Sequence, residues 1–152
     1  MIDLEAGFPR LLPKAISWAE GEAAAAQAAG AMLTETGLRL AHSVGVYHPE
    51  RIRVVEAPSL PFPTDPELSS AALQTGLLGP EMVGLTLGYA VFILAGQGSN
   101  RLISHECRHV YQFEAAGSIA DFLPLYLQQI MSYGYERAPY EVDAREHEID
   151  VA

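Results

Sequence analysis

The chain has 152 residues, of which 49% are hydrophobic and 18% charged, a composition typical of one globular domain. Nineteen acidic residues outnumber nine basic ones, and Lys14 is the only lysine, so the net charge of −10 argues against a protein that binds nucleic acid or an anionic membrane. The length predicts a single domain over residues 1–152. Asp3 and Glu5 stand where a signal peptide would carry positive charge, so we expect the protein in the cytoplasm.

Two helices are expected in residues 1–50. The first covers residues 10–30, because this Ala-rich stretch has high helix propensity and Gly30 can end a helix. The second covers about 32–44, where apolar side chains recur at helical spacing. We expect this second helix to have a packing role.

Strands and a proline-rich loop are expected in residues 51–95. Residues 51–56 alternate apolar and charged side chains, which predicts a strand. Repeated prolines make residues 59–66 an irregular surface loop, and Pro66 can open a short helix that reaches about Gln74.

Residues 83–94 are dense in β-branched and aromatic side chains and therefore predict buried strand. One long strand or two short strands are equally arguable, and a hairpin would place Gly88 in its turn. The charge-free stretch around them, residues 82–100, contains four glycines and ends in polar residues. Its apolar part is too short to cross a bilayer, so no membrane span is expected.

The last region, residues 99–152, has a helical pattern. Ser99 or Asn100 can cap a helix that reaches about Ala116, and Gly117 supplies the left-handed position that often follows a helix. This helix is the first of three that we expect in the region.

Two further helices are expected after Gly117. Asp121 can cap the first, with Pro124 in its first turn and Gly134 at its end. The second begins at Pro139 and runs close to the C-terminus. One side of it carries Glu141, Ala144, Arg145 and Glu148.

Residues 105–109 have the sequence HECRH, an HExxH motif, inside the first of these helices. Residues four apart lie on one face of a helix, so His105 and His109 can bind one ion. Neutral histidine nitrogens bind zinc at about 2.0–2.1 Å, and the carboxylate of Glu106 can reach a water at the open coordination position. The motif therefore predicts a metal site with Glu106 as general base. The alternative is a pair of solvated or core histidines without a metal.

A catalytic zinc site needs a third protein ligand, and Glu141 is our choice. It lies in the first turn of the helix that begins at Pro139, and the chain between it and His109 is long enough for a helix and two turns. Asp143 and His147 are competing ligands, ranked second and third because both point away from the Glu141 side. Glu141 could also be no more than a favourable charge at a helix N-terminus.

The pattern HExxHxxQ followed by a later ExxA resembles that of zincin-like metallopeptidases of the gluzincin type, in which a glutamate lies downstream of HExxH. It is also similar to small bacterial zincin-like domains of unassigned function. The resemblance covers about residues 86–148. It implies an α+β zincin-like fold, with a small β-sheet packed against the HExxH helix and further helices. It also implies a zinc ion held by His105, His109 and Glu141, and Glu106 as general base.

Several side chains near these ligands are candidates for supporting roles. Gln112 lies on the same face of its helix as the histidines and can hydrogen-bond a metal ligand, or cap a neighbouring carbonyl. Four tyrosines lie near the third ligand, and one hydroxyl could stabilise the oxyanion of a tetrahedral intermediate. We favour Tyr133 and Tyr135 over Tyr126 and Tyr140, although all four can equally be packing residues.

The sequence thus predicts a zinc-dependent metallohydrolase that uses metal-activated water, with a peptide or protein as substrate. The alternative is a non-catalytic zinc-binding domain that acts as a scaffold or in protein interaction, in which Asp143 or His147 closes the coordination sphere as a fourth ligand. A third hypothesis is self-inhibition, in which residues 59–66 or the N-terminal helices cover the cleft.

Overall fold

The computed structural model describes residues 3–79 and 81–150. Helices are combined with a small sheet, which confirms the predicted α+β class. In chain order the elements are α1 (Leu4–Ala29), α2 (Glu35–Ser43), the 3-10 helix η1 (Pro49–Arg51), β1 (Arg53–Ala57), α3 (Pro66–Thr75), β2 (Gly84–Leu87), β3 (Ala90–Leu94), α4 (Asn100–Ala116), α5 (Ile119–Tyr133) and α6 (Pro139–Glu146).

The strands of the described residues form one sheet in the order β1-β3-β2. β1 pairs with β3 in parallel, and β2 pairs with β3 in the antiparallel direction, with Leu87 opposite Ala90. Residues 83–94 therefore contain two strands joined as a hairpin. Gly88 lies in the turn with a φ of 65°, a conformation that glycine adopts without the steric cost of a Cβ atom.

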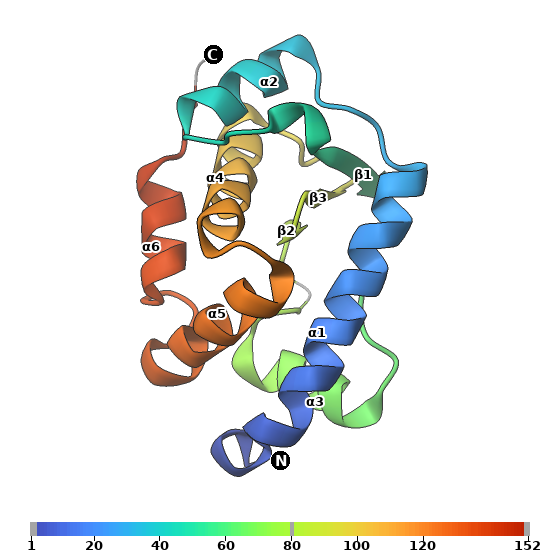
Figure 1. Cartoon of the computed structure of the whole chain (residues 1–152), viewed down its shortest axis with the longest axis vertical. Coiled ribbons are helices and arrows are strands. Elements are labelled where there is room, and N and C mark those ends of the chain that lie inside the picture. The colour runs from blue at the N-terminus through green and yellow to red at the C-terminus, as the bar shows by residue number, and fades with distance from the viewer. Residues whose placement is uncertain (1–2, 80, 151–152) are drawn as a thin grey trace.

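Alternate residues of β3 face opposite sides of the sheet, and different helices cover the two sides. Val91 and Ile93 belong to a core shared with α2 and α4. Ala90 and Phe92 belong to a cluster shared with α1. In Figure 1 the sheet accordingly lies between α4 on one side and α1 on the other, while α6 packs on α4 away from the sheet.

The N-terminal helices begin at positions that differ from the prediction. α1 starts at Leu4 rather than at residue 10, because the Asp3 carboxylate accepts a hydrogen bond from the Ala6 amide and caps the helix. Its Pro9 and Pro13 lie inside the helix. α2 starts at Glu35 rather than 32, because Thr34 is the residue whose side chain caps it.

Three further boundaries differ from the prediction for local reasons. The strand predicted over 51–56 covers Arg53–Ala57, because Arg51 ends the 3-10 helix η1. α5 is capped by Ser118 rather than by Asp121, because the Asp121 amide donates to the Ser118 hydroxyl. The helix therefore begins at Ile119, and Pro124 lies beyond its first turn. α6 ends at Glu146, which leaves Glu148 outside the helix.

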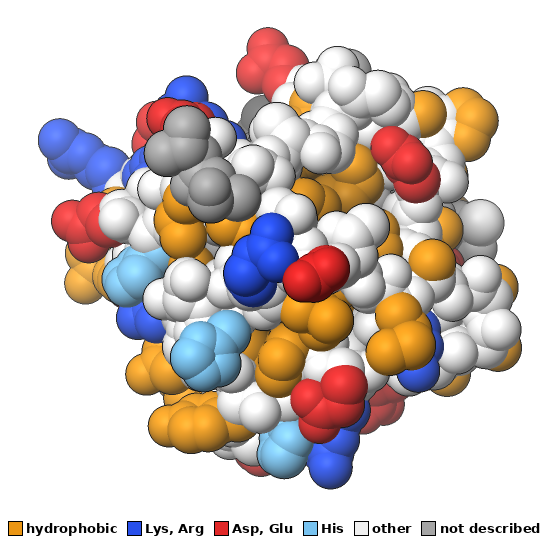
Figure 2. Space-filling model, turned by 90° about the horizontal axis from the view of Figure 1, so that it is seen from above, with side chains coloured by type: hydrophobic (Ala, Val, Ile, Leu, Met, Phe, Trp, Pro, Cys, Tyr) orange, Lys and Arg blue, Asp and Glu red, His pale blue; other side chains and the backbone are white. Residues whose placement is uncertain are grey.

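The structure confirms the predicted bounds of α4 most closely. The Ser99 hydroxyl accepts a hydrogen bond from the Leu102 amide, and Gly117 follows the last turn with a positive φ. Among the helices of the described residues, none has the length and hydrophobicity that a membrane span requires. Figure 2, seen from the α2 end, shows acidic, basic and histidine side chains interspersed with hydrophobic ones.

Candidate metal centre

α4 has two buried sides, and the HExxH motif divides its residues between them. Cys107 and Val110 face the core shared with β3 and α2, where burial raises the pKa of the Cys107 thiol to about 12. His105 and His109 face away from that core, with ring centroids 5.0 Å apart. The four-residue spacing therefore places both imidazoles on one face of the helix, as the motif predicts.

Glu141 reaches both histidines from the first turn of α6. Its Oε1 lies 3.2 Å from Nε2 of His105, and its Oε2 lies 3.0 Å from Nε2 of His109. One nitrogen from each histidine and one oxygen of Glu141 lie within 4.8 Å of one another. Ala144, one turn along α6, is fully buried. The structure thus brings together the three residues that we chose as metal ligands.

The buried carboxylate of Glu141 and the two histidines shift one another's pKa values. Burial alone would raise the pKa of Glu141, but hydrogen bonds from His105 and His109 hold that pKa well below its usual value. Burial alone would lower the pKa of His109, but the hydrogen bond and charge of Glu141 raise it to about 9. The Glu141 carboxylate therefore attracts positive charge to the space between the two imidazoles.

The outer nitrogen of each histidine also has a partner. Nδ1 of His105 lies 2.8 Å from Oε2 of Glu148, whose other oxygen accepts a hydrogen bond from Arg101. Nδ1 of His109 lies 2.7 Å from the amide oxygen of Gln112. Each Nδ1 can therefore keep its proton, and a cation that displaces the proton from each Nε2 would meet a lone pair there.

A second layer of contacts fixes the orientation of Gln112. Its amide nitrogen donates to Asp143 and to the carbonyl oxygen of Tyr140, each at 2.9 Å. Asp143 in turn accepts two hydrogen bonds from Arg108. The network leaves the Gln112 oxygen directed at His109, so Gln112 has the contact that a supporting residue needs.

Asp143 and His147 do not join the three clustered side chains. Asp143 binds Arg108 and Gln112, as described above, and Nδ1 of His147 donates to the carbonyl oxygen of Asp143 at 2.7 Å. Neither residue is part of the group whose atoms converge on one point. Neither of these two residues therefore supplies the fourth protein ligand that the scaffold alternative expects.

Glu106 is buried beside the cluster, and the Thr86 hydroxyl donates to its Oε1 at 2.8 Å. Burial raises the pKa of this carboxyl group. A Cβ atom at Gly84 would lie 2.9 Å from Oε2, so a side chain there would displace the carboxylate from its present position. The strand β2 thus positions Glu106 through two of its residues.

The tyrosines differ in their relation to the cluster. Tyr126 is buried and donates from its hydroxyl to Oε2 of Glu141 at 2.7 Å. Tyr135 lines the same cavity as Glu141, and burial together with the Glu141 charge raises the pKa of its hydroxyl. Tyr133 is 58% exposed and does not line this cavity, so the structure does not bring it to the site. Tyr140 contributes its carbonyl oxygen to Gln112 and stacks its ring on Phe122.

A cavity of about 130 Å³ opens onto the cluster from the side of α1. Glu106, His109 and Glu141 lie in its wall, together with side chains of α1, α3, α5 and β2. Pro63 is the residue of the predicted 59–66 loop that lines this cavity.

Comparison of the chain with protein-family models, curated proteins and solved structures found no match.

Three contacts at the site were not predicted from the sequence. Glu148 lies on the predicted Glu141 side of its segment, seven residues further on, and that spacing was the available signal. Tyr126 was considered but not favoured, and its position opposite Glu141 depends on how α5 packs. Thr86 had no sequence signal, because its contact with Glu106 depends on the packing of β2 against α4.

Proposed function

We propose that this protein is a zinc-dependent hydrolase of zincin-like type that cleaves an amide bond in a peptide. The convergence of His105, His109 and Glu141, with Glu106 buried next to them, is the observation that carries the proposal. The absence of a fourth protein ligand among the described residues near this cluster adds support, because a catalytic zinc site keeps one coordination position open.

The donor atoms suit zinc in type and in separation. Two imidazole nitrogens and one carboxylate oxygen form a ligand set found in catalytic zinc sites. Tetrahedral ligands at about 2.0–2.1 Å from zinc lie about 3.3 Å from one another. One nitrogen of each histidine and one oxygen of Glu141 lie within 4.8 Å of one another, which a small adjustment of the side chains would bring to that separation.

A bound zinc ion would lower the pKa of water and polarise the scissile carbonyl. Glu106 would take a proton from the attacking water and return it to the departing amine. Its raised pKa suits a group that must both accept and release a proton near neutral pH. Thr86 holds Oε1 of Glu106 in place, and the Tyr126 hydroxyl restrains Oε2 of Glu141.

The test measures zinc content and peptide hydrolysis in the wild type, Glu106→Gln and His109→Ala. We expect about one zinc per chain in the wild type and in Glu106→Gln, and loss of zinc in His109→Ala. Hydrolysis should fall about 10²–10⁴-fold in Glu106→Gln, the usual contribution of general-base catalysis. A wild-type protein that stays free of metal when it is made with zinc present would contradict the proposal.

A non-catalytic zinc domain is the second candidate, favoured by the near-complete burial of all three ligand residues. Such a domain would bind zinc in the wild type and in Glu106→Gln with equal stoichiometry, and neither protein would hydrolyse a peptide library. Removal of zinc by a chelator would then lower the melting temperature, because the ion would act as a structural link between α4 and α6.

A further inference from the structure

The cavity beside Glu106 and His109 has polar side chains at one end and almost none elsewhere. At the metal end lie Glu106, His109, Glu141 and the hydroxyl groups that bind them. Tyr135 also brings a hydroxyl to the cavity, and Trp18 an indole N–H. Among the other described residues that line the rest of the cavity, Thr75 alone carries a hydroxyl, amide or charged group. That hydroxyl already donates to carbonyl oxygens of its own helix, α3. The remaining wall is aliphatic or aromatic.

The side chains of α1, α3 and α5 in this wall suit a hydrocarbon group better than a polypeptide backbone. Each residue of a bound peptide brings an N–H and a C=O group that need hydrogen-bond partners, and an unpaired polar group in an apolar site is costly. Away from the metal end, the side chains of α1, α3 and α5 that line the cavity offer few such partners. The part of the substrate that enters the cavity is therefore a hydrocarbon group.

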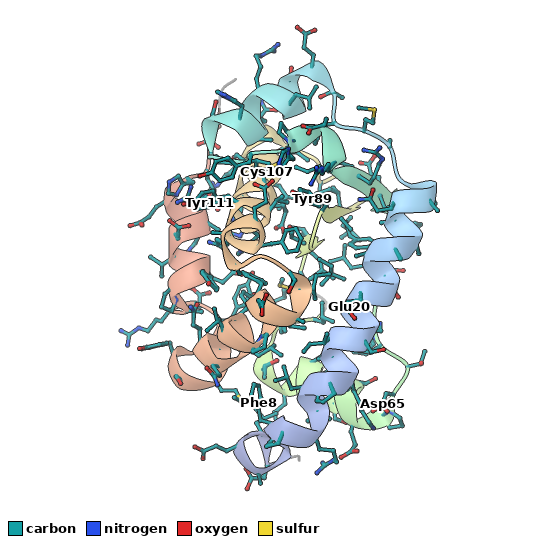
Figure 3. All side chains as sticks on the ribbon, viewed as in Figure 1. Phe8, Glu20, Asp65, Tyr89, Cys107 and Tyr111 are labelled. Atoms are coloured by element: carbon teal, nitrogen blue, oxygen red, sulfur yellow. The ribbon has the colours of Figure 1, made fainter. Side chains whose placement is uncertain are left out.

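The lining of the cavity also extends along much of α1, although the cavity volume is small. The residues of α1 that line it begin at Leu4 and end at Ala19, which corresponds to about 22 Å of helix. Phe8 extends from this helix toward α5 (Figure 3). The cavity volume of about 130 Å³ is slightly smaller than that of an engineered cavity of ~150 Å³ that holds benzene. A group of about six carbon atoms fits this volume, and the extent of the wall along α1 favours an unbranched chain over a ring.

We propose that the substrate is an N-acyl amide whose unbranched hydrocarbon chain, about six carbons long, occupies the cavity between α1, α3 and α5. This inference rests on the proposed hydrolase function. Water adds to the acyl carbon, the carbon–nitrogen bond breaks, and the products are a carboxylic acid and a free amine. Glu106 carries the proton from the water to the leaving nitrogen, so no further reactant is needed.

The experiment uses Trp18, the only tryptophan of the chain, which lines the cavity and reports its occupation by fluorescence. Zinc-loaded Glu106→Gln protein is titrated with N-hexanoylglycine, N-butanoylglycine and N-acetylphenylalanine amide. Each buried methylene should tighten binding about fourfold, so N-hexanoylglycine should bind about fifteenfold more tightly than N-butanoylglycine. Equal affinity for these two probes, or tighter binding of the phenylalanine amide, would overturn the proposal.

A matched pair of variants on α3 locates the bound chain. Ala72 lines the cavity, whereas its neighbour Leu73 is 57% exposed and does not. Ala72→Phe should weaken N-hexanoylglycine binding at least tenfold, and Leu73→Phe should leave it unchanged. Ala71→Met, a second cavity-lining change, should also weaken binding if Ala72→Phe does not fold. Equal binding by folded cavity variants and by Leu73→Phe would contradict the assignment.

Failure of this inference differs from failure of the hydrolase proposal. A zinc-loaded wild type that hydrolyses unacylated peptides, while its variant shows no chain-length dependence, would overturn the acyl-chain inference and leave the hydrolase intact. A wild type that binds no zinc would overturn the hydrolase proposal, and with it the assignment of N-acyl amides as substrates. Zinc-dependent release of glycine from N-hexanoylglycine by the wild type would support both.

Discussion

The two buried sides of α4 differ in what they pack against: one side is apolar, and the other is polar and hydrogen-bonded. On the sheet side, Cys107 and Val110 pack among aliphatic residues of β3 and α2, and Figure 3 shows Cys107 on α4 near α2. On the side that faces α6, His105, His109 and Gln112 are buried with nearly the same completeness. The sheet side needs only a matching shape, because its side chains are apolar and bring no unpaired polar atoms.

The polar side needs a partner for each buried nitrogen and oxygen. Among the residues that the structure describes, no buried side-chain nitrogen or oxygen lacks a hydrogen-bond partner. For His105, His109 and Gln112, those partners come from α6, from the segment after it, and from α4 itself, where Gln112 accepts from His109. We therefore expect the sheet side of α4 to govern the free energy of unfolding and the α6 side to govern metal affinity.

The largest expected effect belongs to the sheet side. Ile93→Ala removes a buried side chain that packs in the core with Cys107 and Val110. The free energy of unfolding should fall by about 2–5 kcal/mol, because truncation loses buried apolar area and leaves a cavity. Urea denaturation measures this change. Zinc affinity of the folded protein should match the wild type, and a parallel loss of zinc affinity would contradict the separation of the two sides.

On the α6 side, Glu148→Gln should weaken zinc binding about 10–100-fold, the usual effect of removing an outer partner of a histidine ligand. The reason is that the carboxylate accepts a hydrogen bond from Nδ1 of His105 and so orients its Nε2. Competition with a chelator measures the affinity. Glu146→Gln, at an exposed position two residues earlier, is the control and should bind zinc as the wild type does.

A smaller effect is expected where the two sides meet. The buried Ser104 hydroxyl accepts a hydrogen bond from the Ile149 amide at 2.8 Å and so holds the segment that carries Glu148 against α4. Ser104→Ala should lower the free energy of unfolding by about 1 kcal/mol. Its zinc affinity should lie between those of the wild type and Glu148→Gln. The exposed Ser132→Ala should change neither quantity, and an affinity loss larger than that of Glu148→Gln would count against this order.

The smallest expected effect is an absence of reaction at Cys107. The thiol is fully buried, so iodoacetamide should label it only when the sheet side of α4 opens. Labelling followed by mass spectrometry should be slow in the wild type and in Glu148→Gln, and faster in Ile93→Ala. Rapid labelling of Glu148→Gln would show that the two sides of α4 open together.

The sequence was most informative where short-range physics decides the structure. Four-residue spacing in a helix places His105 and His109 on one face, and Ser99 can cap only the helix that follows it. The prediction of Glu141 as the third ligand joined two distant parts of the chain, but it needed only a helix that begins at Pro139 and packs on α4. These arguments depend on helix geometry within one or two elements.

Contacts that depend on how several elements pack were not predictable in the same way. Tyr126 and Tyr133 lie on the same helix, and only the docking of α5 against α6 decides that Tyr126 meets Glu141 while Tyr133 is exposed. The Ala-rich composition placed the start of α1 at residue 10, and the cap at Asp3 decides otherwise. The apolar cavity involves four separate elements, and no pattern within one of them predicts it.

The contacts of Glu141 and Glu148 with α4 have a consequence for the order of events during synthesis. α4 and the whole sheet precede these two residues in the chain, so both histidines have been synthesised before either carboxylate exists. Until then α4 can offer a metal ion two imidazoles only, one fewer than the three protein ligands typical of a catalytic zinc site. If zinc binds as proposed, a nascent chain would hold the ion less firmly than the finished protein, and stable loading would follow the arrival of α6 and the residues after it.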